Sequence, residues 1–200
     1  ASGKKFGKTE AGAVWLDPEL TSPFRFYQFW INTSDEDAGR YLRFFTLLGK
    51  GEIEALEAEH AEAPYRRVAQ KALAADVTRR VHGEGGLARA RRATDALFGG
   101  DLDGLGAEEI AEVFADVPSS ELAREALSGE GMSIVDLLAE TGVTPSKGEA
   151  RRSVEGGGIY VNAQRVEGVD STIGTDRAIE GRFLVLRKGK KSYHLVKLTG

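Results

Sequence analysis

The chain opens with glycines, lysines and a hydroxyl residue that could bind phosphate, in the order Gly3-Lys4-Lys5-Phe6-Gly7-Lys8-Thr9. Two lysines three positions apart on a glycine-containing loop can reach a polyphosphate and neutralise the charge that develops on it. A Walker A loop has four residues between its first glycine and its Gly-Lys-Ser/Thr triplet. Here three residues separate Gly3 from Gly7, and no apolar strand precedes them. The spacing therefore excludes a P-loop.

Residues 5–33, KFGKTEAGAVWLDPELTSPFRFYQFWINT, resemble bacterial tyrosyl-tRNA synthetases at their class I KMSKS signature and the segment that follows it. The strings WLDP at 15–18 and YQFW at 27–30 extend the resemblance beyond a bare pair of lysines. On this resemblance Lys5 and Lys8 are the catalytic lysines, which bind the departing pyrophosphate in the transition state. The residues that the family implies for ATP and pyrophosphate binding are Lys5, Phe6, Gly7, Lys8 and Thr9.

The resemblance also implies what the chain lacks. The family joins tyrosine to ATP, with Mg²⁺, and transfers the tyrosyl group to tRNA-Tyr. Its catalytic domain, which holds the HIGH signature and the tyrosine pocket, precedes the lysine loop. His82-Gly83 ends a helical pattern here and does not replace that signature. We therefore expect the C-terminal portion of such an enzyme, which binds no cofactor by itself and is inactive without the catalytic half.

Composition describes an ordinary soluble protein, with 41% hydrophobic and 29% charged residues. There are no cysteines, and the three scattered histidines predict no metal site. The absence of a leader and of a long apolar run favours a cytoplasmic protein without a membrane segment. The net charge of −4 is unevenly distributed, because residues 132–200 hold 11 basic against 8 acidic residues. Positive charge is thus concentrated where an RNA contact would need it.

The fold class predicted is α+β, a mostly α-helical domain followed by a small S4-like α/β domain. Residues 1–20 are the signature loop and connector, and residues 21–128 are a helical domain on the tRNA-facing side. Apolar periodicity predicts helices from Ser22, from Ser34, over 52–61, from Pro64 until Gly83, and then up to Phe98. Two shorter helices are expected around 108–114 and 121–127. Candidate phosphate contacts in this domain are Arg66, Arg67, Arg79, Arg80, Arg89, Arg91 and Arg92, although such arginines commonly pair with nearby acids.

Residues 129–200 carry a second resemblance. Capping boxes at Ser133 and Ser146 predict two short helices, and strands are expected at 159–162, 183–187 and 193–198. The string DLLAETGVTPSKGEARRSVEGGGIYVNAQRV resembles the S4-type RNA-binding domain at the end of bacterial tyrosyl-tRNA synthetases. A helix N-terminus beside a lysine is an anion site. The RNA-binding residues predicted are Ser146, Lys147, Arg151, Arg152 and Asn162, ahead of Lys188, Lys190, Lys191 and Lys197, which could extend the groove or solubilise a hairpin edge.

Three interpretations remain open. The chain is part of a tyrosine–tRNA ligase, a standalone S4-type RNA-binding protein without catalysis, or a helical interaction module whose basic residues are only surface. Residues 5–33 favour the first, because an RNA binder has no use for the lysine loop. The partners expected on that basis are tRNA-Tyr and the N-terminal catalytic domain, through which the full enzyme would form a homodimer.

Overall fold

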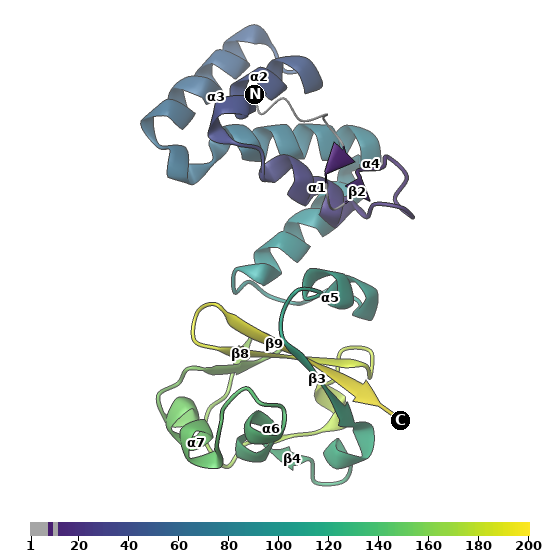
Figure 1. Cartoon of the computed structure of the whole chain (residues 1–200), viewed down its shortest axis with the longest axis vertical. Helices are drawn as coiled ribbons and strands as arrows, with labels where there is room; N and C mark the ends of the chain where they lie inside the picture. The colour runs from purple at the N-terminus through teal and green to yellow at the C-terminus, as the bar shows by residue number, and fades with distance from the viewer. Residues whose placement is uncertain (1–7, 10–11) are drawn as a thin grey trace. The chain divides into compact units, whose positions relative to one another are not determined.

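The computed structural model describes residues 8, 9 and 12–200, and its contacts divide the chain into two compact units, residues 1–91 and 92–200. The first unit is helical, and the second combines short helices with a sheet (Figure 1). The α+β class predicted from the sequence is confirmed. No helix in the described part of the chain is both long and apolar enough to cross a membrane.

The helices of the first unit begin where the sequence places their caps. Ser22 Oγ accepts from the Arg25 amide at 3.2 Å, and Ser34 Oγ accepts from the Asp37 amide at 3.2 Å. Each bond satisfies one of the amides that the first turn of a helix leaves unpaired. The elements are β1 (Lys8–Thr9), β2 (Gly12–Ala13), α1 (Pro23–Ile31), α2 (Asp35–Phe45), α3 (Lys50–Glu62), a 3₁₀ turn (Pro64–Arg66) and α4 (Val68–Leu97), which continues into the second unit.

Two features of α4 differ from or refine the prediction. Pro64 does not open the helix, because residues 64–66 form a 3₁₀ turn and Arg67 adopts a left-handed conformation (φ 54°) before α4 begins. The break expected at Gly83 is a kink, with φ 71° and ψ 177°, inside a helix that resumes after it. The preceding His82 packs edge-on against Phe26, with ring centroids 4.8 Å apart.

The core of the first unit is built around α1. Phe26, Tyr27 and Trp30 are buried, and they belong to one apolar cluster with Leu42 and Leu73. The aromatic helix is therefore largely buried within its own unit and does not require another domain to cover it. Exposed apolar side chains of this unit lie in the connector before α1, at Trp15, Leu16 and Leu20, and also at Phe44, Leu47 and Tyr65.

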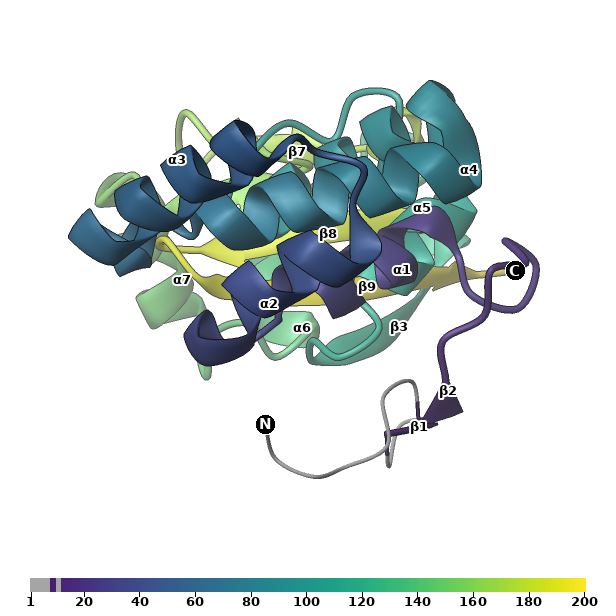
Figure 2. The ribbon, with the colours of Figure 1, turned by 90° about the horizontal axis from the view of Figure 1, so that it is seen from above.

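The second unit is built on a five-stranded sheet of order β3-β9-β8-β5-β6. The β3 and β9 strands are parallel, and the other neighbours are antiparallel. Figure 2 shows β3 beside the long yellow strand β9. The elements are α5 (Ala107–Val113), β3 (Ser119–Ala123), β4 (Met132–Ser133), α6 (Ile134–Glu140), α7 (Lys147–Glu155), β5 (Ile159–Val161), β6 (Gln164–Arg165), β7 (Thr172–Ile173), β8 (Phe183–Lys188) and β9 (Ser192–Thr199), with 3₁₀ turns at Arg124–Leu127 and Thr175–Arg177.

The helix predicted around 121–127 is wrong. Residues 119–123 form β3, and Leu122 is buried opposite Leu198 of β9. As a strand at the edge of the sheet, residues 119–123 bury Leu122 in the core. The sequence of this segment gives no sign that it pairs with a strand so far along the chain. The boundary expected after residue 128 would cut β3 from its sheet, and the contacts divide the chain between Arg91 and Arg92 instead.

The two faces of the sheet have different chemistry. One face holds Ile159, Leu184 and Leu186, which share a buried cluster with Leu137 of α6 and Val154 of α7. Because side chains alternate along a strand, the residues between them lie on the opposite face. There the cross-strand register aligns Arg165, Tyr160, Arg187 and Tyr193 in one row. The first face therefore carries α6 and α7. The opposite face combines this row with the buried Val185 and Leu195, and Phe114 at the end of α5 packs against Tyr193 there, with ring centroids 5.2 Å apart.

The half-buried His194 gives the second unit a pH-dependent stability. Its Nε2 lies 2.9 Å from Ser120 Oγ of β3, and burial lowers the pKa of its imidazole below the ordinary value of 6.5. The unfolded chain then takes up this proton at a higher pH than the folded chain. The stabilisation is full above about pH 6.5 and is lost as the pH falls through the lower folded pKa.

We therefore expect the free energy of unfolding of the second unit to fall between pH 7.5 and pH 5.5. Urea titrations followed by NMR signals of β8 and β9 measure this fall. His194→Gln should flatten it, because glutamine does not titrate. An equal fall in the variant would show that other groups cause it.

Candidate nucleic-acid interface

The signature loop is described only at its end. Lys5, Phe6 and Gly7 lie outside the described residues, so their predicted roles stay predictions. Lys8 and Thr9 form β1, which pairs antiparallel with β2 in the register Lys8 with Ala13 and Thr9 with Gly12. The second signature lysine thus belongs to the first strand of a two-stranded hairpin.

The first turn of α7 holds two of the predicted RNA-binding residues. Ser146 is the N-cap, and its Oγ accepts from the Glu149 amide at 3.3 Å. Lys147 follows as the first helical residue, with 67% of its side chain exposed and its Nζ 2.8 Å from Asp136 Oδ1 of α6. A cation at a helix N-terminus adds to the positive end of the helix dipole. The arrangement favours an anion at this end of α7.

Arg151 and Arg152 add two more cations to the same helix. Both are exposed, and neither side chain makes a hydrogen bond or ion pair in the described part of the chain. Long helical side chains point back toward the N-terminus. Arg152 follows this rule, since its Nη1 lies 3.8 Å from the position that a Cβ would occupy on Gly148. Its guanidinium therefore reaches toward the turn that Ser146 and Lys147 begin.

Asn162 lies apart from these four residues, in the two-residue turn between β5 and β6. Its φ is 48°, in the left-handed region that asparagine tolerates. Its Oδ1 accepts from the Val185 amide at 2.9 Å, and its Nδ2 donates to the Arg177 carbonyl. The side-chain amide is thus occupied by bonds inside the domain, which assign it a structural role that the sequence did not reveal.

Most of the arginines proposed in the helical region have internal partners. Arg67 Nη2 donates to the Ile31 carbonyl at 2.5 Å, which ties the start of α4 to the end of α1. Arg66, Arg79 and Arg80 lie 4.0, 2.7 and 2.9 Å from acidic oxygens of Glu59, Glu84 and Asp76. The exposed members without a hydrogen bond or ion pair among the described residues are Arg89, Arg91 and Arg92.

The turn between β8 and β9 brings further lysines beside α7. Lys188 Nζ lies 2.5 Å from Glu149 Oε1, so the capping box predicted at Ser146 forms only its serine half. The box predicted at Ser133 is wrong, because Ser133 makes no side-chain cap bond. The Gly189 amide donates to the Gly158 carbonyl at 2.7 Å and holds the turn against the end of α7. Lys190 and Lys191 remain exposed on it.

Arg165 is a basic residue that the sequence analysis missed. Its guanidinium lies across Gly157 (φ 65°), at the place where any Cβ would overlap it. The positive φ at 157 favours glycine, whereas the exposed Arg165 guanidinium could move away from a Cβ. No group of three acidic or histidine side chains that could hold a metal ion occurs among the described residues.

Comparison with known proteins identifies the chain. Residues 1–99 match the family model "tRNA synthetases class I (W and Y)", and residues 109–196 match "Tyrosine--tRNA ligase SYY-like C-terminal domain". A tyrosine–tRNA ligase of Roseiflexus castenholzii is 54% identical over 199 residues, which cover 100% of this chain and 47% of the relative. The chain belongs to the tyrosine–tRNA ligase family. It spans about half the length of the curated relatives it matches.

A second curated relative matches over nearly the same length. A tyrosine–tRNA ligase of Bacillus caldotenax is 52% identical over 197 residues, covering 98% of this chain and 46% of the relative. A solution structure of a tyrosyl-tRNA synthetase C-terminal domain is 40% identical, with a TM-score of 0.41, over 52% of this chain and 99% of that domain. The family resemblance drawn from the KFGKT and SKGEARR strings is confirmed.

The contacts of Asn162 lead to a stability prediction. Asn162→Ala removes both amide bonds and leaves the Val185 amide unpaired, so we expect a loss of about 1–3 kcal/mol in the free energy of unfolding. Asn162→Gly also removes both side-chain bonds but adopts the positive φ without strain, so its loss of stability measures the side-chain bonds alone. Denaturant unfolding measures both, with Arg152→Ala as a control that should unfold like the parent. Unchanged stability in both Asn162 variants would refute the structural role.

Proposed function

We propose that this chain supplies the signature-loop lysines and the tRNA-binding units of a tyrosine–tRNA ligase. The whole enzyme would activate tyrosine with ATP and Mg²⁺ and transfer it to tRNA-Tyr, and this portion alone would be inactive. The observation that carries the proposal is the match of the entire chain, at 54% identity, to tyrosine–tRNA ligases about twice as long. A cytoplasmic location and a homodimer formed through the catalytic half belong to the same proposal.

The lysine loop would act on the departing pyrophosphate. Lys5 and Lys8 flank Phe6 and Gly7, and Thr9 supplies a hydroxyl in the position that the KMSKS signature gives to its last residue. Ammonium groups positioned where negative charge develops stabilise the transition state more than the bound substrate. The catalytic half would place the nucleotide against this loop. The exposed Trp15, Leu16 and Leu20 follow it closely in sequence and would be covered by that half.

The N-terminal end of α7 would bind the tRNA backbone. Ser146 caps the N-terminus of α7 through the Glu149 amide, Lys147 follows it with an exposed side chain, and Arg152 reaches back toward the same turn. Arg151 adds an exposed guanidinium. These are contacts to phosphates, which position a protein on nucleic acid without reading its sequence. A standalone RNA-binding protein is disfavoured, because the class I synthetase match covers residues 1–99.

Arg152→Ala should weaken tRNA-Tyr binding and lower the slope of log K against log salt by about one phosphate contact. Filter binding or fluorescence anisotropy of the 200-residue chain over a salt series measures both. Arg79→Ala is the matched control, because Arg79 is paired with Glu84 and should leave affinity and slope unchanged. The same slope for Arg152→Ala and the parent would contradict the phosphate contact.

In the complete enzyme, Lys8→Ala should lower the rate of tyrosyl-adenylate formation by about 10²–10³-fold with little change in the Kd for tyrosine, since the contact forms in the transition state. Pyrophosphate exchange and equilibrium binding measure the two effects separately. Lys50→Ala, at an 88% exposed lysine, is the control. Equal losses in binding and in rate would place Lys8 in ground-state binding and reject this role.

A further inference from the structure

Thr21 is a buried polar residue immediately before the cap of α1. It is only 7% exposed, and its Oγ1 accepts a hydrogen bond from the Trp15 amide at 3.0 Å. The next residue, Ser22, caps α1 through the Arg25 amide and does not use Thr21 for this. The Thr21 hydroxyl therefore serves the connector rather than the helix, because its partner lies six residues earlier in the chain.

The connector before α1 is a closed loop. The Asp17 carbonyl accepts from the Leu20 amide at 3.1 Å and from the Thr21 amide at 3.0 Å. The Asp17 side chain adds a third bond, from the Glu19 amide to its Oδ1 at 3.0 Å. Such an aspartate turn fixes the backbone locally. The bond from Trp15 to Thr21 closes the loop at its base, so the position of Trp15 is set relative to the start of α1.

This loop holds the hairpin that carries Lys8. Lys8 of β1 lies opposite Ala13 of β2. Val14 follows Ala13 and packs against the apolar cluster of the first unit, and Trp15 follows Val14. Figure 2 shows the chain running from β2 to the start of α1. The strand opposite Lys8 is thus held at two consecutive residues, by a side chain in the core and by an amide bonded to Thr21.

We infer that Thr21 is a positioning residue for Lys8. Its hydroxyl fixes the end of the strand that pairs with Lys8, and so sets where the lysine stands when pyrophosphate departs. The inference rests on the proposed function, because it concerns the geometry of the signature lysine. Stabilisation by a positioned cation depends on placement, and an error of about 1 Å can cost about 10²-fold in rate.

A purely stabilising role for Thr21 makes different predictions. The apolar cluster around α1 contains Phe26, Tyr27 and Trp30 but not Thr21, so losing the Thr21 hydroxyl leaves this packing intact. A residue that only stabilised the fold would affect activity whether or not Lys8 is present. A positioning residue affects the rate through Lys8.

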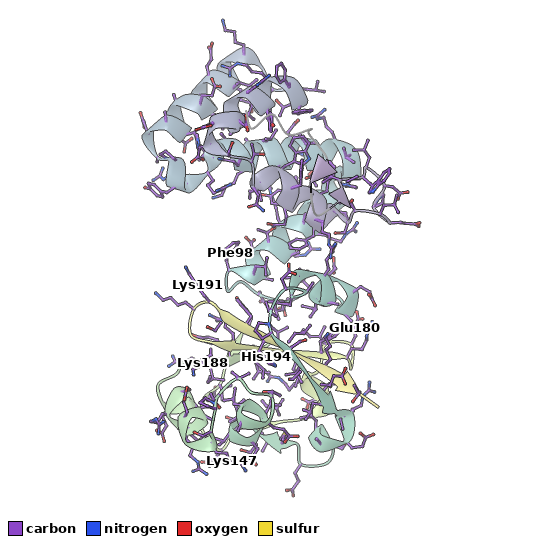
Figure 3. The ribbon with its side chains drawn as sticks, viewed as in Figure 1. Phe98, Lys147, Glu180, Lys188, Lys191 and His194 are labelled. Atoms are coloured by element: carbon purple, nitrogen blue, oxygen red, sulfur yellow. The ribbon has the colours of Figure 1, made fainter. Side chains whose placement is uncertain are left out.

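The affinity for tRNA is an independent readout. Thr21 belongs to residues 1–91, whereas the cations proposed for tRNA binding on α7 and on the hairpin turn belong to residues 92–200. Figure 3 labels Lys147, Lys188 and Lys191 among them. Loss of the Thr21 hydroxyl should therefore slow tyrosine activation and leave the Kd for tRNA-Tyr unchanged.

The test uses the complete enzyme carrying Thr21→Val, which keeps the shape of the side chain and removes the acceptor. One neutral hydrogen bond corresponds to a factor of about 2 to 13 in a rate. The single-turnover rate of tyrosyl-adenylate formation should fall by that factor, with the Kd for tyrosine unchanged. Thr21→Ser keeps the hydroxyl and should restore the rate. Thr46→Val is the matched control, because Thr46 Oγ1 accepts from the Leu48 amide at 3.4 Å in the turn after α2.

A double-mutant cycle with Lys8→Ala distinguishes positioning from stability. Once the lysine is gone, Thr21→Val should lower the rate by less than about twofold. A loss as large as in the parent would overturn the inference, as would an unchanged rate in Thr21→Val or a loss that Thr21→Ser does not restore. The adenylate formed per subunit counts the folded active sites, so unfolded protein is not mistaken for a lower rate.

The outcomes also separate this inference from the proposed function. If Lys8→Ala lowers the rate and Thr21→Val does not, the role of the lysine stands and the positioning role is refuted. If neither variant changes the rate, both the role of the lysine loop and this inference fail. In the 200-residue chain, the Trp15 amide should exchange its hydrogen faster in Thr21→Val than in Thr21→Ser. Equal exchange would refute the bond itself.

Discussion

The concentration of positive charge along α7 is the constraint on which the second unit depends. Lys147 occupies the first turn of a helix whose own N-terminus is already positive, which is unfavourable, whereas Arg152 lies in the last turn, where a cation complements the helix dipole. The protein accommodates them by burying the opposite side of the helix through Ala150 and Val154. Asp136 and Glu149 each pair with a lysine, so the charge is partly offset, while neither the Arg151 nor the Arg152 side chain has a partner among residues 8, 9 and 12–200.

The sheet provides the support that this helix needs. The β8 and β9 strands lie inside the sheet. The edge strand β3 pairs in parallel with β9 and satisfies the backbone groups that β9 would otherwise leave unpaired on that side. On the face away from α7, stacking of Arg187 on Tyr160 and the bond from Tyr193 to Ala96 connect the sheet to the end of α4. One scaffold therefore presents basic groups on a helix and two exposed lysines on the hairpin turn.

Local signals in the sequence were sufficient for much of this structure. The caps at Ser22, Ser34 and Ser146 were predicted correctly, because capping depends on residues within one turn. The parallel pairing of β3 with β9 could not be predicted, since it joins segments far apart in the chain and SSELA has no strand pattern of its own. The hydrogen bonds of Asn162 and the stacking of Arg187 on Tyr160 could not be predicted either, because they also join segments far apart in the chain. A motif shows which residues a family shares, and only packing shows which of them are occupied inside the fold.

The central claim is that the N-terminal end of α7 contacts the backbone of tRNA-Tyr. An amide NMR titration of the chain with tRNA-Tyr tests it most directly, because it reports every residue at once. The account predicts that the signals of residues 146–152 shift or broaden first. Unchanged signals over 146–152, with all the shifts confined to other elements, would contradict it.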